Sequence, residues 1–212
     1  MNVIPKSIAP SPDVELPTQT LWDWRRRISD LYSTVRANHD PSAAWQLWRD
    51  TRADLFDFHP QTPLDPGSAL PNYFEYDPAF RFAVSLAEAP SGEPFYLSAG
   101  GDGSVRLAPF AETRGLKEAL GAELLLYWIG GYGGGVFLPF LDATTGAETY
   151  AGGRYLLDTI KSADLGALPD GRIILDFNFA YNPSCSYSAR WVCPLAPRVN
   201  RLPSRIEAGE RL

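Results

Sequence analysis

The sequence predicts an α+β protein, in which two N-terminal helices pack against a curled or barrel-like, mostly antiparallel β-sheet. Apolar residues recur at three- and four-residue steps between residues 20 and 58, which is the period of an amphipathic helix. From residue 80 onward they alternate with polar residues or form short runs, separated by turns that contain glycine or proline. Neighbouring strands joined by such short turns favour antiparallel pairing.

Length and composition predict one domain behind a short arm. The 212 residues, of which 45% are hydrophobic, are enough for one substantial core. We expect this domain over residues 18–212. Residues 1–17 contain four prolines and few large apolar side chains, so they bury too little surface to offset the entropy lost on ordering. A mobile N-terminal arm is therefore expected at 1–17.

Two helices are expected next along the chain. The first begins near Thr20, where Thr20 and Asp23 resemble a capping arrangement. Before the second, Asp40 offers a side-chain acceptor at the N-cap, and Pro41 fits the first turn, where its missing N–H costs nothing. Proline disfavours helical geometry in the residue that precedes it, so Pro60 ends the second helix.

The remaining chain is expected to form strands joined by short turns. A one-turn helix is predicted at 116–120, and the glycine-rich run 130–135 is interpreted as a hairpin turn between two apolar strands. That run lacks the Lys-Ser/Thr of a phosphate-binding loop. The predicted strands cover residues 80–86, 94–98, 105–110, 124–129, 136–141, 154–157 and 173–179.

The last of these strands carries the first candidate site residues. In a strand with a period of two, Asp176 and Asn178 share one face, while leucine and phenylalanine occupy the other. The apolar face is expected to meet the core, so the two polar side chains point either to solvent or into a polar cavity. Burial of a carboxylate and an amide requires hydrogen-bonding partners. Two interpretations remain open: a ligand-binding cavity, or polar side chains that only tie neighbouring loops together.

Arg154 is the residue expected beside Asp176. It begins a predicted strand after two glycines, and its guanidinium could hold a carboxylate or phosphate of a ligand or pair with a structural acid. Tyr181 and Asn182 follow the Asp176 strand closely and are expected to orient a polar ligand. In this interpretation Asp176 serves as a base or a hydrogen-bond acceptor.

The two cysteines, Cys185 and Cys193, allow three interpretations: structural thiols, a redox-sensitive pair, or one nucleophile with a distant base. His59 lies where the second helix stops, so a Cys185–His59 couple is the feasible nucleophilic arrangement. The spacing of seven residues between the cysteines differs from that of zinc knuckles, and no cofactor fingerprint appears. We therefore expect no metal and no cofactor.

Charge and hydropathy disfavour other partners. The net charge of −6, without a basic stripe, argues against nucleic acid. No apolar run reaches the ~18 residues of a membrane helix, and the N-terminal residues lack the apolar core of a secretion signal. The expected location is therefore the cytoplasm, with no membrane partner. The sequence leaves homo-oligomerisation open.

Five segments resemble the DUF1684 proteins, an uncharacterised bacterial family. They are WRDTRADLFDFHPQTPL (48–64), YFEYDPAFRF (73–82), FLDATTGAETYAGGRYL (140–156), DFNFAYNPSCSYSARWVCPLAPRVNRL (176–202) and IEAGER (206–211). They span most of the chain from residue 48 onward, in order. The resemblance implies no assigned activity. The positions that stand where the motifs of this family stand are Asp142, Gly146, Thr149, Tyr150, Gly153, Arg154, Asp176, Asn178, Tyr181, Asn182, Pro183, Cys185, Cys193, Pro194, Asn200 and Glu210.

Two functions are therefore expected as alternatives. The first is a small-molecule site for a polar or anionic ligand at one end of the sheet; if it is enzymatic, hydrolysis or acyl transfer is favoured. The second is a non-enzymatic scaffold or protein-interaction module, in which the motif residues form a buried hydrogen-bond network and the tryptophans of the two helices meet a partner. Those tryptophans are Trp22, Trp24, Trp45 and Trp48.

Overall fold

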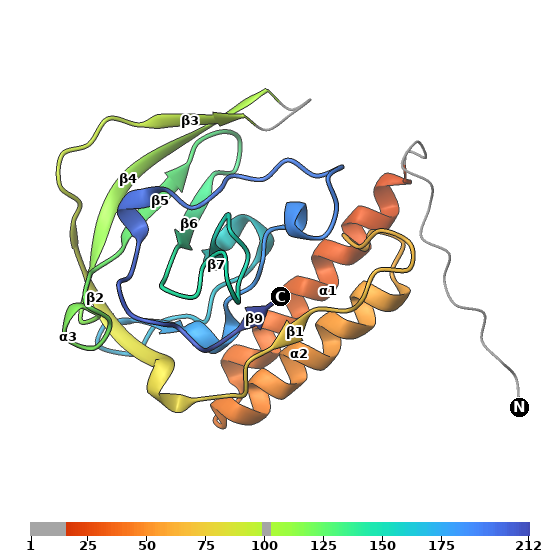
Figure 1. Cartoon of the computed structure of the whole chain (residues 1–212), viewed down its shortest axis with the longest axis horizontal. Coiled ribbons are helices and arrows are strands. Elements are labelled where there is room, and N and C mark those ends of the chain that lie inside the picture. The colour runs from red at the N-terminus through yellow and green to blue at the C-terminus, as the bar shows by residue number, and fades with distance from the viewer. Residues whose placement is uncertain (1–15, 99–102) are drawn as a thin grey trace, which may run out of the picture.

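The computed structural model describes residues 16–98 and 103–212 and confirms the predicted α+β class (Figure 1). The mobile arm predicted at 1–17 falls almost entirely outside the described residues. Two long helices, α1 (Thr18–Ala37) and α2 (Pro41–Phe58), lie side by side against a curled sheet. None of the helices among the described residues is long and apolar enough to cross a membrane.

The start of α2 matches the predicted capping, whereas the start of α1 does not. The side chain of Asp40 accepts hydrogen bonds from the backbone N–H groups of Ser42 and Ala43, and Pro41 occupies the first turn. The capping arrangement predicted for Thr20 and Asp23 is wrong. Helix α1 begins two residues earlier, so Thr20 lies inside it and its hydroxyl donates to the Pro17 carbonyl over 2.7 Å.

The main sheet is antiparallel throughout and nearly closed. Its strand order is β7-β6-β5-β4-β2-β8, and β3 pairs with β4 beside this path. A backbone bridge between Tyr155 in β7 and Tyr181 just after β8 brings the two ends together. The strands are β2 (Arg81–Glu88), β3 (Phe95–Ser98), β4 (Ser104–Arg114), β5 (Leu125–Ile129), β6 (Gly135–Phe140), β7 (Arg154–Asp158) and β8 (Ile173–Asp176).

Several predicted elements are confirmed, whereas two strand ends are wrong: β4 continues to Arg114 instead of ending at residue 110, and the last predicted strand ends early. The short helix α3 (Lys117–Leu120) and the β5–β6 hairpin across the glycine-rich turn lie where the sequence places them. Strand β8 ends at Asp176, however, and Phe177–Phe179 form a 3-10 turn instead of continuing the strand. The cause is local, because the Asp176 carboxylate accepts a hydrogen bond from the backbone N–H of Asn178 and so caps the turn.

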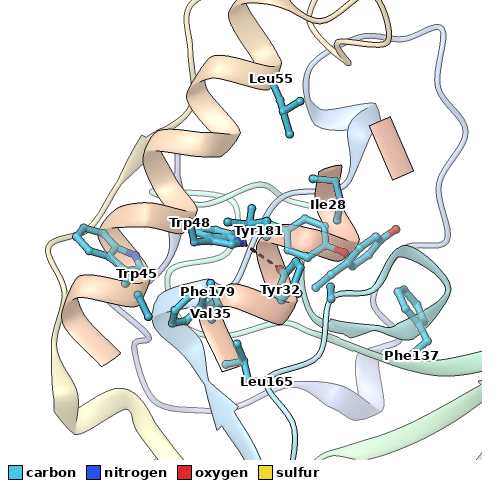
Figure 2. Packing of buried hydrophobic residues seen from close by; sticks show 14 of the residues in the cluster. Ile28, Tyr32, Val35, Trp45, Trp48, Leu55, Phe137, Leu165, Phe179 and Tyr181 are labelled. Carbon is cyan, nitrogen blue, oxygen red and sulfur yellow. Dashed lines mark hydrogen bonds between the residues drawn. The ribbon is translucent and has the colours of Figure 1, made fainter. Parts of the chain in front are cut away.

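One core cluster joins the helices to the sheet (Figure 2). Trp48 is fully buried, donates its indole N–H to the Tyr32 hydroxyl over 3.1 Å and meets Phe179 edge to face. Trp45 is also buried and Trp24 is half-buried, so only Trp22 of the four helix tryptophans is largely exposed, at 65%. Trp45 and Trp48 therefore hold the helix layer to the sheet, and Trp22 is the tryptophan with the most exposed surface in this pair of helices.

A second core cluster is formed by the sheet, α3 and the C-terminal segment, with Phe140, Phe177, Leu202 and Ile206 fully buried. The last residues then form β9 (Glu210–Arg211), which pairs antiparallel with β1 (Asn72–Tyr73) beside α2. The C-terminus therefore ends close to the helix layer (Figure 1).

Candidate functional site

Asp176 and Asn178 are fully buried in a hydrogen-bond network at the end of β8. Asp176 accepts from Arg81 over 3.1 Å and from the Asn178 side chain over 2.8 Å. Asn178 in turn binds both the backbone N–H and the carbonyl of Asp77. Burial raises the pKa of Asp176 above its usual value, against the opposing effect of the Asn178 and Arg81 donors. These groups tie β8 to the segment before β2.

The space beside this network is small. A crevice of about 40 Å³ is lined by residues that include Val35, Arg81 and Phe179. A water molecule occupies about 30 Å³ in the liquid, so the crevice has room for about one water and not for a metabolite. The contacts of Asp176 tie parts of the fold together, and the crevice beside Arg81 is too small for a metabolite.

Arg154 lies elsewhere in the core, and the predicted pairing with Asp176 is wrong. Its guanidinium donates to the carbonyls of Ile206, Ala208 and Glu210 and to the Asp142 carboxylate, the last over 3.5 Å. Burial lowers the pKa of Arg154 to about 10, with Asp142 acting in the opposite direction. Arg154 therefore stays charged at neutral pH and grips the C-terminal segment from inside the protein.

Asp142 completes this second network. Its carboxylate accepts from the backbone N–H groups of Thr144 and Ile206 and from the Thr144 and Thr145 hydroxyls. The turn at 142–149 and the C-terminal segment are thereby fixed to one carboxylate, which is itself 1% exposed.

A third network is centred on Glu210, and the sequence did not predict that its members lie together. Its fully buried carboxylate accepts from Arg52 of α2, from the Tyr73 and Tyr187 hydroxyls and from the backbone N–H of Asn182. The Arg52 guanidinium lies about 5 Å from the ring centroids of Trp48, Phe56 and Tyr181. Tyr181 and Asn182 thus serve an internal ion pair. No local pattern in the sequence links residues 158 positions apart.

Cys185 and Cys193 lie together in the segment that follows, and both are free thiols and half-buried. The backbone N–H of Cys185 donates to the Cys193 sulfur over 3.4 Å, and the Tyr150 hydroxyl lies 3.6 Å from the Cys185 sulfur. Burial raises the pKa of Cys193 above its usual value, so this thiol is protonated at neutral pH. The structure therefore brings together the two cysteines but not the predicted base.

His59 occupies the end of α2 and contacts Asp23 of α1, not Cys185. Its Nδ1 accepts from the backbone N–H of Gln61 over 3.0 Å, so the ring proton is on Nε2, which lies 3.4 Å from the Asp23 carboxylate. Both ring nitrogens are engaged. The Cys185–His59 couple expected from the sequence is not assembled.

His59 should make the fold less stable below neutral pH. Burial lowers its pKa below 6.5, against the opposing effect of Asp23. A histidine with a lowered pKa in the folded state binds fewer protons there than in the unfolded chain, so its contribution is complete above pH 6.5 and is lost as pH falls through the folded value. In the Asp23→Asn variant, NMR titration of the His59 ring should give a still lower pKa. A ring pKa above 6.5 in the parent protein would contradict this.

A recess is lined by residues of both long helices. A groove of about 860 Å³ runs between α1 and α2, with Leu31 and Leu55 buried in its floor and Leu47 and Phe58 exposed at its edges. The full lining is Gln19, Thr20, Asp23, Arg27, Asp30, Leu31, Thr34, Leu47, Thr51, Asp54, Leu55, Phe58, His59 and Pro60. Of the residues predicted as site residues, this groove contains His59.

Comparisons with known proteins identify relatives but no activity. A family model described as a protein of unknown function (DUF1684) matches residues 70–211. No curated protein matches. Among solved structures, the solution NMR structure of an uncharacterised protein from Haloarcula marismortui is 32% identical, with a TM-score of 0.53, and the match covers 79% of this chain and 91% of that one.

Proposed function

Because this chain belongs to the DUF1684 family, whose description assigns no function, we propose from the geometry that it is a non-enzymatic interaction module whose α1–α2 groove binds a basic amphipathic helix of a partner protein. The groove carries this proposal. Two of the candidate catalytic residues are held by other groups of the chain: Asp176 binds Arg81 and Asn178, and His59, which lines the groove, binds Asp23 and the Gln61 backbone. These contacts favour binding over hydrolysis or acyl transfer.

The groove has the length of a helix-binding site. Its lining runs from Gln19 to Thr34 along α1 and from Leu47 to Pro60 along α2. At 1.5 Å per residue, the α1 side extends about 22 Å, which corresponds to roughly four helical turns. Such an elongated, open recess suits a helix laid along it better than a compact metabolite.

The chemistry of the lining sets the kind of helix. The leucine floor and the exposed Leu47 and Phe58 offer contacts for an apolar stripe at helical spacing. Three aspartates and one arginine line the groove, so its charge is negative. Asp23 is already paired with Arg26 and Arg27, whereas Asp30 and Asp54 are exposed. Lysine or arginine beside the apolar stripe of a partner would complement this charge.

The internal networks support this function by holding the groove in shape. Arg52 anchors α2 to Glu210, and Trp48 and Tyr32 join α2 to α1. A site whose walls are fixed before binding spends less free energy on ordering when the partner arrives. A cytoplasmic location is proposed with it, since free cysteines suit a reducing compartment.

Helical peptides of graded charge test this proposal. Three labelled peptides of about 18 residues share a leucine stripe at helical spacing. Their remaining positions are lysine in the first peptide, glutamine in the second and glutamate in the third. Fluorescence anisotropy at low salt should give the tightest binding for the lysine peptide and the weakest for the glutamate peptide, with a gap of at least about tenfold between them. A lysine peptide with a scrambled stripe should not bind. Equal affinities for all four would reject the groove as a helix site.

Two matched pairs of variants locate the contact. Leu47→Ser should weaken the lysine peptide about tenfold, whereas Leu21→Ser, which alters an equally exposed residue outside the groove, should not. Asp54→Asn should weaken binding at low salt, and Asp57→Asn, one turn further along α2, should leave it unchanged. A metabolite library gives the opposing outcome. If a metabolite raises the melting temperature of the parent protein but not of Leu47→Ser, and no peptide binds, the occupant is a small molecule and the helix proposal fails.

A further inference from the structure

The segment from Pro183 to Pro197 holds its two cysteines in position without regular strands. Its single helical element is the 3-10 turn Ser184–Ser186. Side chains fix it at intervals: Arg190 donates to the Thr62 carbonyl over 2.7 Å, Trp191 donates to the Pro63 carbonyl, and the Tyr155 hydroxyl donates to the Pro194 carbonyl. These contacts hold the chain on both sides of Cys193.

The two thiols meet within this segment. The 3.4 Å contact joins the Cys185 backbone N–H to the Cys193 sulfur, so the Cys193 sulfur lies against the residue with which it would pair. Disulfide formation requires Cα atoms within about 4.4–6.8 Å of each other, and the contact between the Cys193 sulfur and the Cys185 backbone shows that the two residues are neighbours in space. Both side chains are half-buried, which leaves them accessible to a small oxidant.

We infer that Cys185 and Cys193 are a reversible oxidation site, at which a peroxide converts the two thiols into an intramolecular disulfide. The Cys185 thiol first releases its proton, and the resulting thiolate attacks one peroxide oxygen. The O–O bond breaks, a sulfenic acid forms, and the hydroxide that leaves takes up the released proton to give one water. The Cys193 sulfur then attacks the sulfenic sulfur, the S–O bond breaks, and a second water leaves with the Cys193 proton. Two thiols and one hydrogen peroxide thus give one disulfide and two waters.

Tyr150 assists the first step as a positioning residue. Its hydroxyl lies 3.6 Å from the Cys185 sulfur, and burial raises the pKa of Tyr150 to about 12, so it carries its proton at neutral pH. A phenol in this position can donate to a developing thiolate. The Cys193 sulfur accepts a hydrogen bond from the backbone N–H of Cys185. The rate should rise with pH because the thiolate is the reacting form. This site does not depend on the groove or its occupant.

Peptide mapping tests the inference directly. The reduced full chain is treated with hydrogen peroxide, free thiols are blocked, and trypsin is added without reductant. Cleavage after Arg172, Arg190 and Arg198 places the two cysteines in separate peptides, 173–190 and 191–198. We expect the linked pair as the main product, two hydrogens lighter than the sum of the two peptides and separated by dithiothreitol. Independent oxidation of both cysteines, or linkage only between chains, would overturn the inference.

Single variants separate the two steps. Cys193→Ser should abolish the linked peptide and leave a Cys185 sulfenic acid that dimedone traps. Tyr150→Phe keeps the ring and should slow peroxide consumption while leaving the final linkage intact. A disulfide formed from the native arrangement should also raise the melting temperature by about 5 °C, reversibly with reductant. A melting temperature that is lower after oxidation would show that the disulfide does not fit the folded arrangement of the two cysteines.

Discussion

Replacing Glu210 with alanine is expected to lower the free energy of unfolding by about 3–5 kcal/mol. The change leaves the Arg52 guanidinium charged and buried among three aromatic rings, without its carboxylate. The Tyr187 hydroxyl and the backbone N–H of Asn182 lose their acceptor at the same time. An unpaired buried charge costs more than the contact itself contributes. Urea unfolding followed by tryptophan fluorescence measures this loss.

The controls for Glu210 separate charge from position. Glu207 lies in the same C-terminal segment but is exposed and pairs with Arg205, so Glu207→Ala should change stability by less than about 0.5 kcal/mol. The double variant Arg52→Met, Glu210→Met removes both charges and should be less damaging than Glu210→Ala alone. If Glu210→Ala and Glu207→Ala are equally mild, the buried ion pair does not hold α2 to the C-terminus.

Replacing Arg154 with methionine should destabilise the protein by a similar amount, about 3–5 kcal/mol. Methionine retains apolar bulk but removes the donors to the Ile206 and Ala208 carbonyls and the cation opposite Asp142. All these acceptors are buried, so water does not replace the lost donors at low cost. The C-terminal segment should loosen, and trypsin should cut the folded variant after Arg201 and Arg205 earlier than the parent.

Two comparisons sharpen the Arg154 result. Arg154→Lys keeps the charge but not the planar fork that reaches several acceptors at once, so it should rescue only part of the stability. Arg205→Met removes an exposed arginine from the same segment and should cost less than about 0.5 kcal/mol. Unchanged tryptic cleavage in Arg154→Met would show that the C-terminal segment is held by its apolar side chains alone.

The parts of the fold that follow from local chemistry could be predicted from the sequence. Asp40 and Pro41 set the start of α2 through contacts within three residues, and the glycine-rich turn sets the β5–β6 hairpin. Even Asp176 and Asn178 were correctly associated, although for the wrong reason: a capped 3-10 turn joins them, not a shared strand face. A period-two pattern cannot reveal a strand that stops within its own motif.

For the candidate site, the sequence could predict which polar residues matter but not which of them contact one another. The polar motif residues were identified, but a guanidinium such as that of Arg154 accepts any acid in reach, and the sequence does not say which acid the chain brings to it. His59 illustrates the same limit, since its partner Asp23 lies on the other helix. The groove was not predicted at all, because it arises from the packing of α1 on α2.

The 158-residue separation between Arg52 and Glu210 bears on the order in which the protein can fold. During synthesis the buried counter-ion of α2 is made 158 residues after Arg52. Contacts that close such long loops slow folding, because loop entropy is lost before the contact repays it. Until Glu210 arrives, the apolar inner face of the helix pair has no complete sheet to cover it. The nascent chain therefore exposes the apolar face of these two helices to aggregation until the later strands are made.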